Sequence, residues 1–253
     1  MRIDIPSPDK IPSLRALWRE AFGDTDAFLD IFFATAFSPE RCRCITEGEQ
    51  VVAALYIFNC EFEHRRIAYI YAIATAESHR GRGLCRTLMN ETHRQLKELG
   101  YMGCILVPGS SELFELYRKM GYSICSHIGT LEVNADGAPT EIRAINKDEY
   151  AALRRQYLPR GGVIQQNENL EFLARQASFY AGEDFVLAVQ KRNDALYSPE
   201  LLGNVDRAPG IVRALGFSKG KFRIPDAQKP FAMYLPLCDQ STAAPSYFGL
   251  AFD

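Results

Sequence analysis

The sequence lacks an apolar run long enough to cross a membrane, because no stretch reaches the ~18 consecutive apolar residues that a spanning helix requires. The first residues, MRIDIPSPDK, also lack the apolar segment of a secretory signal peptide. These two absences argue against a membrane-spanning helix and against export. We therefore expect a cytoplasmic protein with no membrane partner.

A strong charge of either sign is also missing, since 29 Lys and Arg residues stand against 31 Asp and Glu residues, for a formal net charge of −2. This balance gives no reason to expect nucleic acid as a partner. The seven cysteines are scattered, and the C-x-C pair Cys42 and Cys44 has no second Cys or His pair at zinc spacing. We expect free thiols and no metal site.

Apolar runs typical of strands alternate with amphipathic helical patterns over the first half of the chain. The helical patterns cover residues 7–22, 24–37, 83–99 and 111–120. The strand-like runs cover residues 2–6, 41–46, 50–62, 67–75, 101–107 and 122–133. The run 67–75, IAYIYAIAT, is apolar or small except for its last residue, which predicts a strand buried on both faces. The pattern predicts an α/β (α+β) fold with a mixed central sheet flanked by helices.

The polar, turn-rich segment NADGAPT at residues 134–140 is the best candidate for a linker. Beyond it, residues 140–158 repeat the opening plan of a short strand followed by a helix, and residues 211–224 echo residues 116–128. We therefore predict two domains, residues 1–135 and residues 140–253, the second a degenerate copy of the first. Coincidence between short segments is the alternative.

The segment ESHRGRGLCRTLM at residues 77–89 places three arginines and two glycines between the buried strand and the next helix. A helix N-terminus carries unpaired N–H groups and a partial positive charge, and glycine lets a ligand approach the backbone closely. Arg80, Arg82 and Arg86 add full charges, so the segment predicts a phosphate site. An exposed turn with incidental arginines is the simpler alternative.

Two common phosphate motifs are absent from this segment. The P-loop pattern G-x-x-x-x-G-K-[ST] does not occur. The dinucleotide pattern G-x-G-x-x-G fails because Arg86 stands where the third glycine should be. These absences argue against a P-loop or dinucleotide-binding protein.

Residues 1–133 resemble the GCN5-related N-acetyltransferase (GNAT) superfamily in three ordered pieces. YAIATAESHRGRGLCRTLM is similar to the acetyl-CoA motif, a strand followed by [QR]-x-x-G-x-[GA] and a helix; YMGCILVPGSS is similar to the next strand; and LFELYRKMGY is similar to the closing motif. Cys85 departs from the pattern at the final [GA] position. The chain is most similar to the enhanced-intracellular-survival type, whose members carry a second, degenerate acetyltransferase-like region. It looks like an abbreviated relative without their third domain.

The resemblance implies direct transfer of an acetyl group from acetyl-CoA, the co-substrate, to an amine acceptor, with no metal. In such folds the strand before the turn separates from its neighbour, and its N–H groups stabilise the tetrahedral oxyanion. The pyrophosphate is expected on the turn. The implied cofactor-binding residues are Ile73, Ala74, Thr75, Arg80, Gly81, Arg82, Gly83, Leu84, Cys85, Arg86 and Ser111.

Tyr117 matches the superfamily's helical tyrosine, which implies a catalytic role in donating a proton to the departing CoA thiolate. The alternative is a core aromatic residue whose hydroxyl bonds to the backbone. Leu113, Leu116 and Met120 share its helical spacing.

The amine needs a base, because a free alkyl amine has a pKa of ~10. Residues 67–75 lack a carboxylate, and Glu61, Glu63 and His64 near the strand turn are weaker candidates. In the enhanced-intracellular-survival type, the terminal carboxylate is the base. The chain ends SYFGLAFD, too apolar for a free tail, so we expect it to dock in the acceptor cleft and bring the Asp253 carboxylates to the thioester. A tail packed as an edge strand is the alternative.

Two functional classes remain. The first is a cytoplasmic N-acetyltransferase acting on a small amine or a peptide amine. The second is a non-catalytic acyl-CoA-binding module. Asp24 and Asp26 are candidates for attracting a cationic amine or for capping a helix. The sequence names neither the acceptor nor the oligomeric state, and a homo-oligomer stays among the alternatives.

Overall fold

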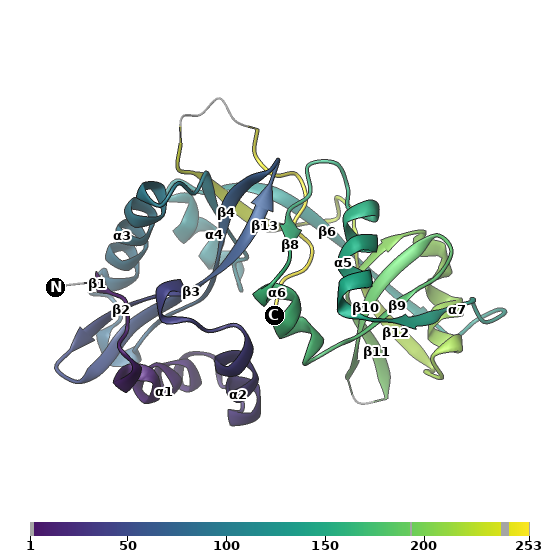
Figure 1. The fold of residues 1–253 in the computed structure, drawn as a ribbon, viewed down its shortest axis with the longest axis horizontal. Coiled ribbons are helices and arrows are strands. Elements are labelled where there is room, and N and C mark those ends of the chain that lie inside the picture. Colours follow the sequence, from purple (N-terminus) through teal and green to yellow (C-terminus); the bar gives the residue numbers. More distant parts are fainter. Residues whose placement is uncertain (1–2, 193, 239–242, 253) are drawn as a thin grey trace.

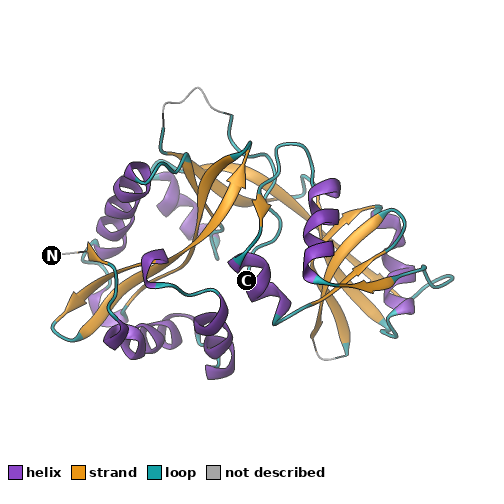
Figure 2. Ribbon diagram, viewed as in Figure 1, coloured by secondary structure: helices purple, strands orange, loops and turns teal. Residues whose placement is uncertain are grey.

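The computed structural model describes residues 3–192, 194–238 and 243–252. Two lobes share a single 13-stranded sheet that runs from one end of the molecule to the other (Figure 1). Helices flank this sheet in both lobes (Figure 2). Among the described residues, no helix has the length and apolarity needed to cross a membrane.

The helices are α1 (Ile11–Phe22), α2 (Asp26–Thr35), α3 (Leu84–Glu98), α4 (Ser111–Arg118), α5 (Lys147–Tyr157), α6 (Glu168–Ala174) and α7 (Ala208–Ala214). The strands are β1 (Ile3–Asp4), β2 (Cys42–Glu47), β3 (Gln50–Phe62), β4 (Arg65–Thr75), β5 (Gly103–Leu106), β6 (Ser123–Asn134), β7 (Arg143–Ile145), β8 (Ile164–Gln165), β9 (Ser178–Ala181), β10 (Phe185–Arg192), β11 (Ala195–Gly203), β12 (Lys219–Pro225) and β13 (Lys229–Pro236).

The sheet is mixed, as the sequence predicts. Its strand order is β1-β2-β3-β4-β5-β13-β6-β12-β11-β10-β9-β7, with β8 beside β3. The pairs β4–β5 and β11–β12 are parallel, whereas β3–β4 and β10–β11 are antiparallel. Each parallel pair is joined by a helical crossover, α3 in the first lobe and α7 in the second.

The first lobe has helices on both faces of its sheet because the central strands are apolar on both faces. Along β3, Tyr56 and Phe58 pack with Trp18 of α1 in one core. Leu55 and Ile57, the intervening residues, pack with α3 in a second core. This two-residue alternation buries the strand on both faces.

The two lobes repeat one order of elements. In the first, β1 and two helices precede the antiparallel strands β2, β3 and β4, followed by α3 and the parallel strand β5. In the second, β7 with α5 and α6 precedes β9, β10 and β11, followed by α7 and β12. The topology therefore identifies the second half as a structural repeat of the first.

The sequence echo between residues 116–128 and 211–224 has a different origin from the repeat. By strand order, α7 and β12 correspond to α3 and β5 rather than to α4 and β6. Gly100, Gly121 and Gly216 all follow helices with φ between +76° and +94°. Each is followed by an aromatic residue whose N–H bonds back to the helix, as Tyr122 N–H does to Tyr117 C=O at 3.1 Å. The echo is thus a helix-ending motif that recurs in the chain.

The lobes are joined by strands that pair across the predicted domain boundary. β6 pairs with β13 through residues 123–128 and with β12 through residues 128–134. β13, although it lies within residues 140–253, occupies the position between β5 and β6. The division into residues 1–135 and 140–253 stays a prediction about folding units. In the structure, strands from both parts are hydrogen-bonded to each other in one continuous sheet.

Candidate active site

A β-bulge interrupts β4 just before its end. Ala54 faces Ala74 and Tyr56 faces Tyr71, so two residues of β4, Ala72 and Ile73, lie opposite one residue of β3. Ala72 has φ +47°, a left-handed conformation that is uncommon for residues with a side chain. Such backbone strain persists only where the surrounding structure holds it in place, and it occurs often at functional sites.

Beyond the bulge, β4 separates from β5. The two strands pair only at Ala68–Cys104 and Tyr69–Ile105 among the described residues. Ala76 N–H donates to Val52 C=O at 2.9 Å, and antiparallel pairing alternates the direction of successive N–H groups. The N–H of Ala74 therefore points toward β3, whereas that of Thr75 points into the gap beside β5.

The glycine turn follows β4 and leads into α3. Gly81 and Gly83 have φ +75° and +77°, and a Cβ on either would meet no atom within 4 Å. Gly83 is the N-cap of α3 and supplies no side chain to cap it. The N–H groups of the first helical turn are thus available to a ligand on an open surface.

The predicted cationic residues around the turn differ in their partners. Arg82 donates to Glu47 at 2.6 Å, and the same carboxylate lies 3.2 Å from His79. The Arg82 guanidinium is the main cause of the lowered pKa of Glu47. Arg80 donates to Thr75 C=O at 3.4 Å, whereas Arg86 is exposed.

Leu84 and Cys85 of the predicted cofactor set have a structural role in the core below the turn. Leu84 is buried in the core beneath α3, and Cys85 is partly buried against the same core. Burial raises the pKa of the Cys85 thiol, so it remains neutral at physiological pH. Ser111 lies at the exposed start of α4 and does not line the cavity described next, whereas Pro108 and Gly109 do.

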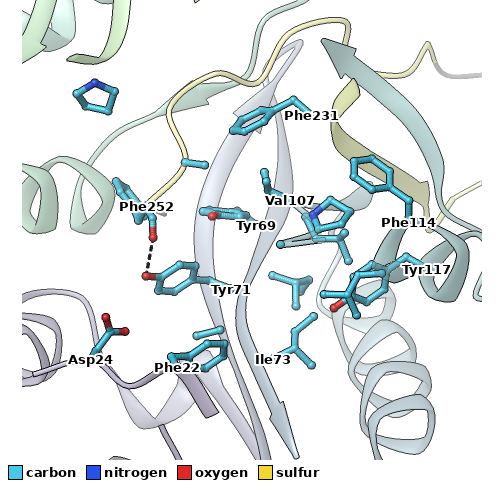
Figure 3. Close-up of a pocket in the computed structure, with 18 of the residues that line it drawn as sticks. Phe22, Asp24, Tyr69, Tyr71, Ile73, Val107, Phe114, Tyr117, Phe231 and Phe252 are labelled. Atoms are coloured by element: carbon cyan, nitrogen blue, oxygen red, sulfur yellow. Dashed lines mark hydrogen bonds between the residues drawn. The ribbon is translucent and has the colours of Figure 1, made fainter. Parts of the chain in front are cut away.

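A cavity of about 730 Å³ lies along the outer half of β4. Figure 3 shows Ile73, Val107 and Tyr117 on one side of the strand and Asp24 and Phe252 on the other. Its walls come from β4, the ends of α1 and β5, the α1–α2 loop, α4 and the second lobe. They are largely aromatic, with Trp18, Phe22, Phe28, Tyr69, Tyr71, Phe114, Tyr117, Phe231 and Phe252 among the lining residues.

Tyr117 faces this cavity from α4. Its side chain is 6% exposed, and its ring lies 5.9 Å from the ring of Tyr122 in an edge-on contact. Burial raises the pKa of Tyr117 well above its ordinary value, so the hydroxyl stays protonated at neutral pH. No group in the described part of the chain hydrogen-bonds to this hydroxyl, which leaves the backbone-bonded alternative without support.

The tail docks against the other side of β4. Tyr71 donates its hydroxyl to the carbonyl of Phe252 at 2.8 Å, and the Phe252 ring lies 5.0 Å from that of Phe58. Ala251 and Phe252 line the cavity. The described tail makes one isolated bridge, Gly162 to Tyr247, and no edge strand. Asp253, the predicted base, lies outside the described residues.

Among the described residues that line the cavity, Asp24 is the one carboxylate and Lys229 is the one cation. Asp24 accepts a hydrogen bond from Trp18 Nε1 at 2.8 Å. The helix cap that sequence reasoning offered for Asp24 and Asp26 is supplied by Thr25, which accepts from Phe28 N–H at 3.3 Å.

The other titratable candidates lie elsewhere. Asp26 forms an exposed ion pair with Arg19. Glu61 and His64 pair with each other at the β3–β4 turn, and neither they nor Glu63 line the cavity. The described residues contain no group of three or more His, Cys, Asp or Glu side chains placed to bind a metal ion, and every cysteine is a free thiol.

Sequence reasoning missed Tyr71 and the contribution of β13. Tyr71 lies in an apolar run and reads as a core residue. A signal was present, because Tyr69 and Tyr71 share one face of a buried strand and their hydroxyls need partners. Phe231 and Lys229, from β13, reach the cavity through a strand pairing that no local pattern predicts.

The site combines a bulged strand, a gap beside its parallel neighbour and a glycine turn without a side-chain cap. This combination agrees with the class of acyltransferases to which the sequence motifs are similar. A family model described as an acetyltransferase (GNAT) domain matches residues 2–125. Residues 2–125 are thus similar to the acetyltransferase (GNAT) domain.

Solved structures of the same fold extend over both lobes. A GCN5-related N-acetyltransferase from Kribbella flavida is similar with a TM-score of 0.70 and 16% identity, covering 93% of this chain and 72% of that chain. One from Anabaena variabilis gives a TM-score of 0.73 at 15% identity, covering 94% and 73%. Eis1 from Mycobacterium abscessus gives 0.68 at 11% identity, covering 94% and 74%. No curated protein sequence matches the chain.

Proposed function

We propose that the protein transfers an acetyl group from acetyl-CoA to a primary amine of a small molecule or peptide, by direct attack in a ternary complex. The observation that carries this proposal is the bulge at Ala72 and Ile73, beyond which β4 and β5 are no longer paired. In the proposed complex the N–H groups of Ile73 and Thr75 would face the gap between these strands. The thioester carbonyl would lie in this gap. Both N–H groups would then stabilise the oxyanion that forms when the amine attacks.

The cofactor would extend from this gap to the glycine turn. Its pyrophosphate would rest on the backbone of residues 80–85, where the open surface at Gly81 and Gly83 leaves room for phosphate oxygens. Arg80 and Arg86 supply charge from the two ends of the turn. Arg82 acts jointly with Glu47, whose carboxylate offsets part of its charge.

The chemistry follows from two proton movements. The amine loses a proton to a base, attacks the thioester carbon, and forms the amide as the C–S bond breaks. Tyr117 donates its proton to the departing thiolate, a role that its protonated, cavity-facing hydroxyl supports. Asp253 is the proposed base. Removing residues 249–253 should reduce turnover with little change in acetyl-CoA affinity, and unchanged turnover would rule out this role.

The cavity also suggests which amines fit. Its aromatic lining and Asp24, the one carboxylate among the described lining residues, favour one cationic group carried on an apolar or aromatic body. Lys229 in the lining disfavours a polycation. We therefore expect arylalkyl monoamines such as phenethylamine to be better acceptors than spermidine.

Titration calorimetry with CoA, together with thiol release from acetyl-CoA over an amine panel, tests the proposal. We expect CoA binding and preferential acetylation of arylalkyl amines, and Asp24→Asn should raise the amine KM by roughly tenfold through loss of one charge-assisted contact. CoA binding without turnover of any amine would favour a non-catalytic acyl-CoA-binding module. No binding at millimolar CoA would contradict both.

A further inference from the structure

The second lobe contains a counterpart of the β4 bulge. Ala188 faces Glu200 and Gln190 faces Tyr197, so Ser198 and Pro199 lie opposite a single residue of β10. This register reproduces that of the first lobe, where Ala54 faces Ala74 and Tyr56 faces Tyr71. Matching the two registers places Tyr197 at the position of Tyr71, Pro199 at that of Ile73, and Glu200 at that of Ala74.

The counterpart has lost the features that serve acyl transfer. Proline has no N–H, so Pro199 lacks the donor that we propose for Ile73 in the first lobe. Glu200 is 1% exposed and is held by Arg154 through bonds of 2.6 and 3.0 Å. A buried carboxylate with a single strong partner retains acceptor capacity for a further donor.

That donor comes from the C-terminal tail. Tyr247 donates its hydroxyl to Glu200 Oε1 at 3.0 Å. Arg223 of β12, across the counterpart cleft, donates to the carbonyls of Gly249 at 3.0 Å and Ala251 at 3.4 Å. The tail therefore lies over the ends of β11 and β12, where the first lobe has its open gap.

Every carbonyl of residues 247–252 accepts a hydrogen bond, although the segment has no regular structure. The donors are Val163 N–H for residue 247, Ser126 Oγ for 248, Arg223 for 249 and 251, Gln165 Nε2 for 250, and Tyr71 for 252. Most of these donors are buried side chains. An irregular segment satisfied in this way is held in one conformation.

We propose that the degenerate cleft of the second lobe is a clamp for residues 247–252, with Glu200 and Arg223 as positioning residues. The clamp sets the tail so that Ala251 and Phe252 form one wall of the acceptor cavity in the first lobe. Its effect on acceptor kinetics rests on the proposed function, whereas its effect on tail order does not.

Tyr247→Phe tests the clamp, because it removes only the hydroxyl that donates to Glu200. Hydrogen exchange over residues 244–252 should accelerate roughly tenfold, the order expected from loss of one hydrogen bond to a charged group. The KM for the amine should rise while the Kd for acetyl-CoA stays unchanged. Arg223→Lys, which keeps the charge but not the fork of donors, should also accelerate exchange.

Tyr157→Phe is the matched control, because Tyr157 donates its hydroxyl to Glu183 C=O at 3.1 Å in the same lobe and makes no hydrogen bond to residues 243–252. It should leave tail exchange unchanged. Wild-type exchange over residues 244–252 in folded Tyr247→Phe and Arg223→Lys would overturn the proposal. If no amine is acetylated, the exchange measurement still decides whether the clamp exists, so the two proposals fail separately.

Discussion

Tyr117 has a buried ring and a hydroxyl that faces the cavity, and these two properties determine what its replacement should do. Tyr117→Phe keeps the ring and its packing against Tyr122. It removes only the hydroxyl, to which no described group bonds. The consequences should therefore appear in catalysis rather than in stability.

We expect Tyr117→Phe to lower kcat by about 100-fold, the order contributed by a positioned general acid. The free energy of unfolding should change by less than ~0.5 kcal/mol, as for substitutions that break no interaction. Steady-state kinetics, chemical denaturation and CoA calorimetry check these expectations. An unchanged kcat would mean that the thiolate takes its proton from another source.

His93 is a second residue whose surroundings predict a measurable effect. It is a buried residue of α3, its ring lies 2.8 Å from the Tyr122 hydroxyl, and burial lowers its pKa from 6.5 to about 4. Between these values the unfolded chain binds a proton that the folded protein does not. Its contribution therefore lowers stability as pH falls from 6.5 toward 4, and then levels off.

Replacing His93 with Gln should remove this dependence. The full shift from 6.5 to about 4 corresponds to at most roughly 3 kcal/mol. Thermal unfolding between pH 4 and 7 should show a smaller acid-induced loss of Tm in His93→Gln than in the wild type. Parallel curves for the two proteins would be the contrary result.

At the scale of elements, the glycine turn offers a test of the phosphate site. Gly81→Ala and Gly83→Ala should weaken CoA binding by roughly tenfold, because a Cβ would occupy the space where phosphate oxygens approach the backbone. Both should also destabilise the fold by about 1 kcal/mol, since Ala is strained at positive φ.

Gly216→Ala separates these two effects. Gly216 resembles the turn glycines, because it has φ +76° and a Cβ added there would meet no atom within 4 Å. It differs from them in location, since it follows α7 in the second lobe. It should show the same loss of stability with unchanged CoA affinity. Calorimetry and denaturation of the three variants make the comparison, and unaltered CoA affinity in all three would contradict a phosphate site at the turn.

Local sequence signals predicted the elements around the site well. The helix at residues 83–99 and the strand at 50–62 occur as α3 and β3, because their periodicity and terminal glycines are local properties. The bulge in β4 could not be predicted, since it is a register shift relative to β3. Arg82 was expected to face phosphate alone, and its partner Glu47 lies 35 residues earlier in the chain.

At the scale of the whole molecule, the position of β13 makes the two lobes depend on each other. Ala232 and Met233 are fully buried, and β13 supplies the only described strand between β5 and β6. We therefore expect residues 1–135 alone to lack a cooperative unfolding transition, because two apolar strand edges would be exposed.

Adding residues 140–253 as a separate fragment should restore the fold by supplying β13. Circular dichroism and heteronuclear NMR of the fragments, alone and mixed, check this. A sharp unfolding transition for residues 1–135 alone would show that the first lobe folds without the exchanged strand. Sequence reasoning could suggest the repeat, but it could not assign β13 to the first lobe, because that pairing joins residues 103–106 to residues 233–236, far apart in the chain.

Because β13 is the last described strand in the sequence, the ribosome synthesises it long after β5 and β6. At 5–20 residues per second, the roughly one hundred residues between β6 and β13 take on the order of 5–20 s to synthesise. Throughout that interval the edges of β5 and β6 that pair with β13 in the folded protein have no partner strand, and they are exposed to chaperones and to neighbouring nascent chains. Slower translation would lengthen this vulnerable interval, so the yield of folded protein should respond to elongation rate over residues 135–229.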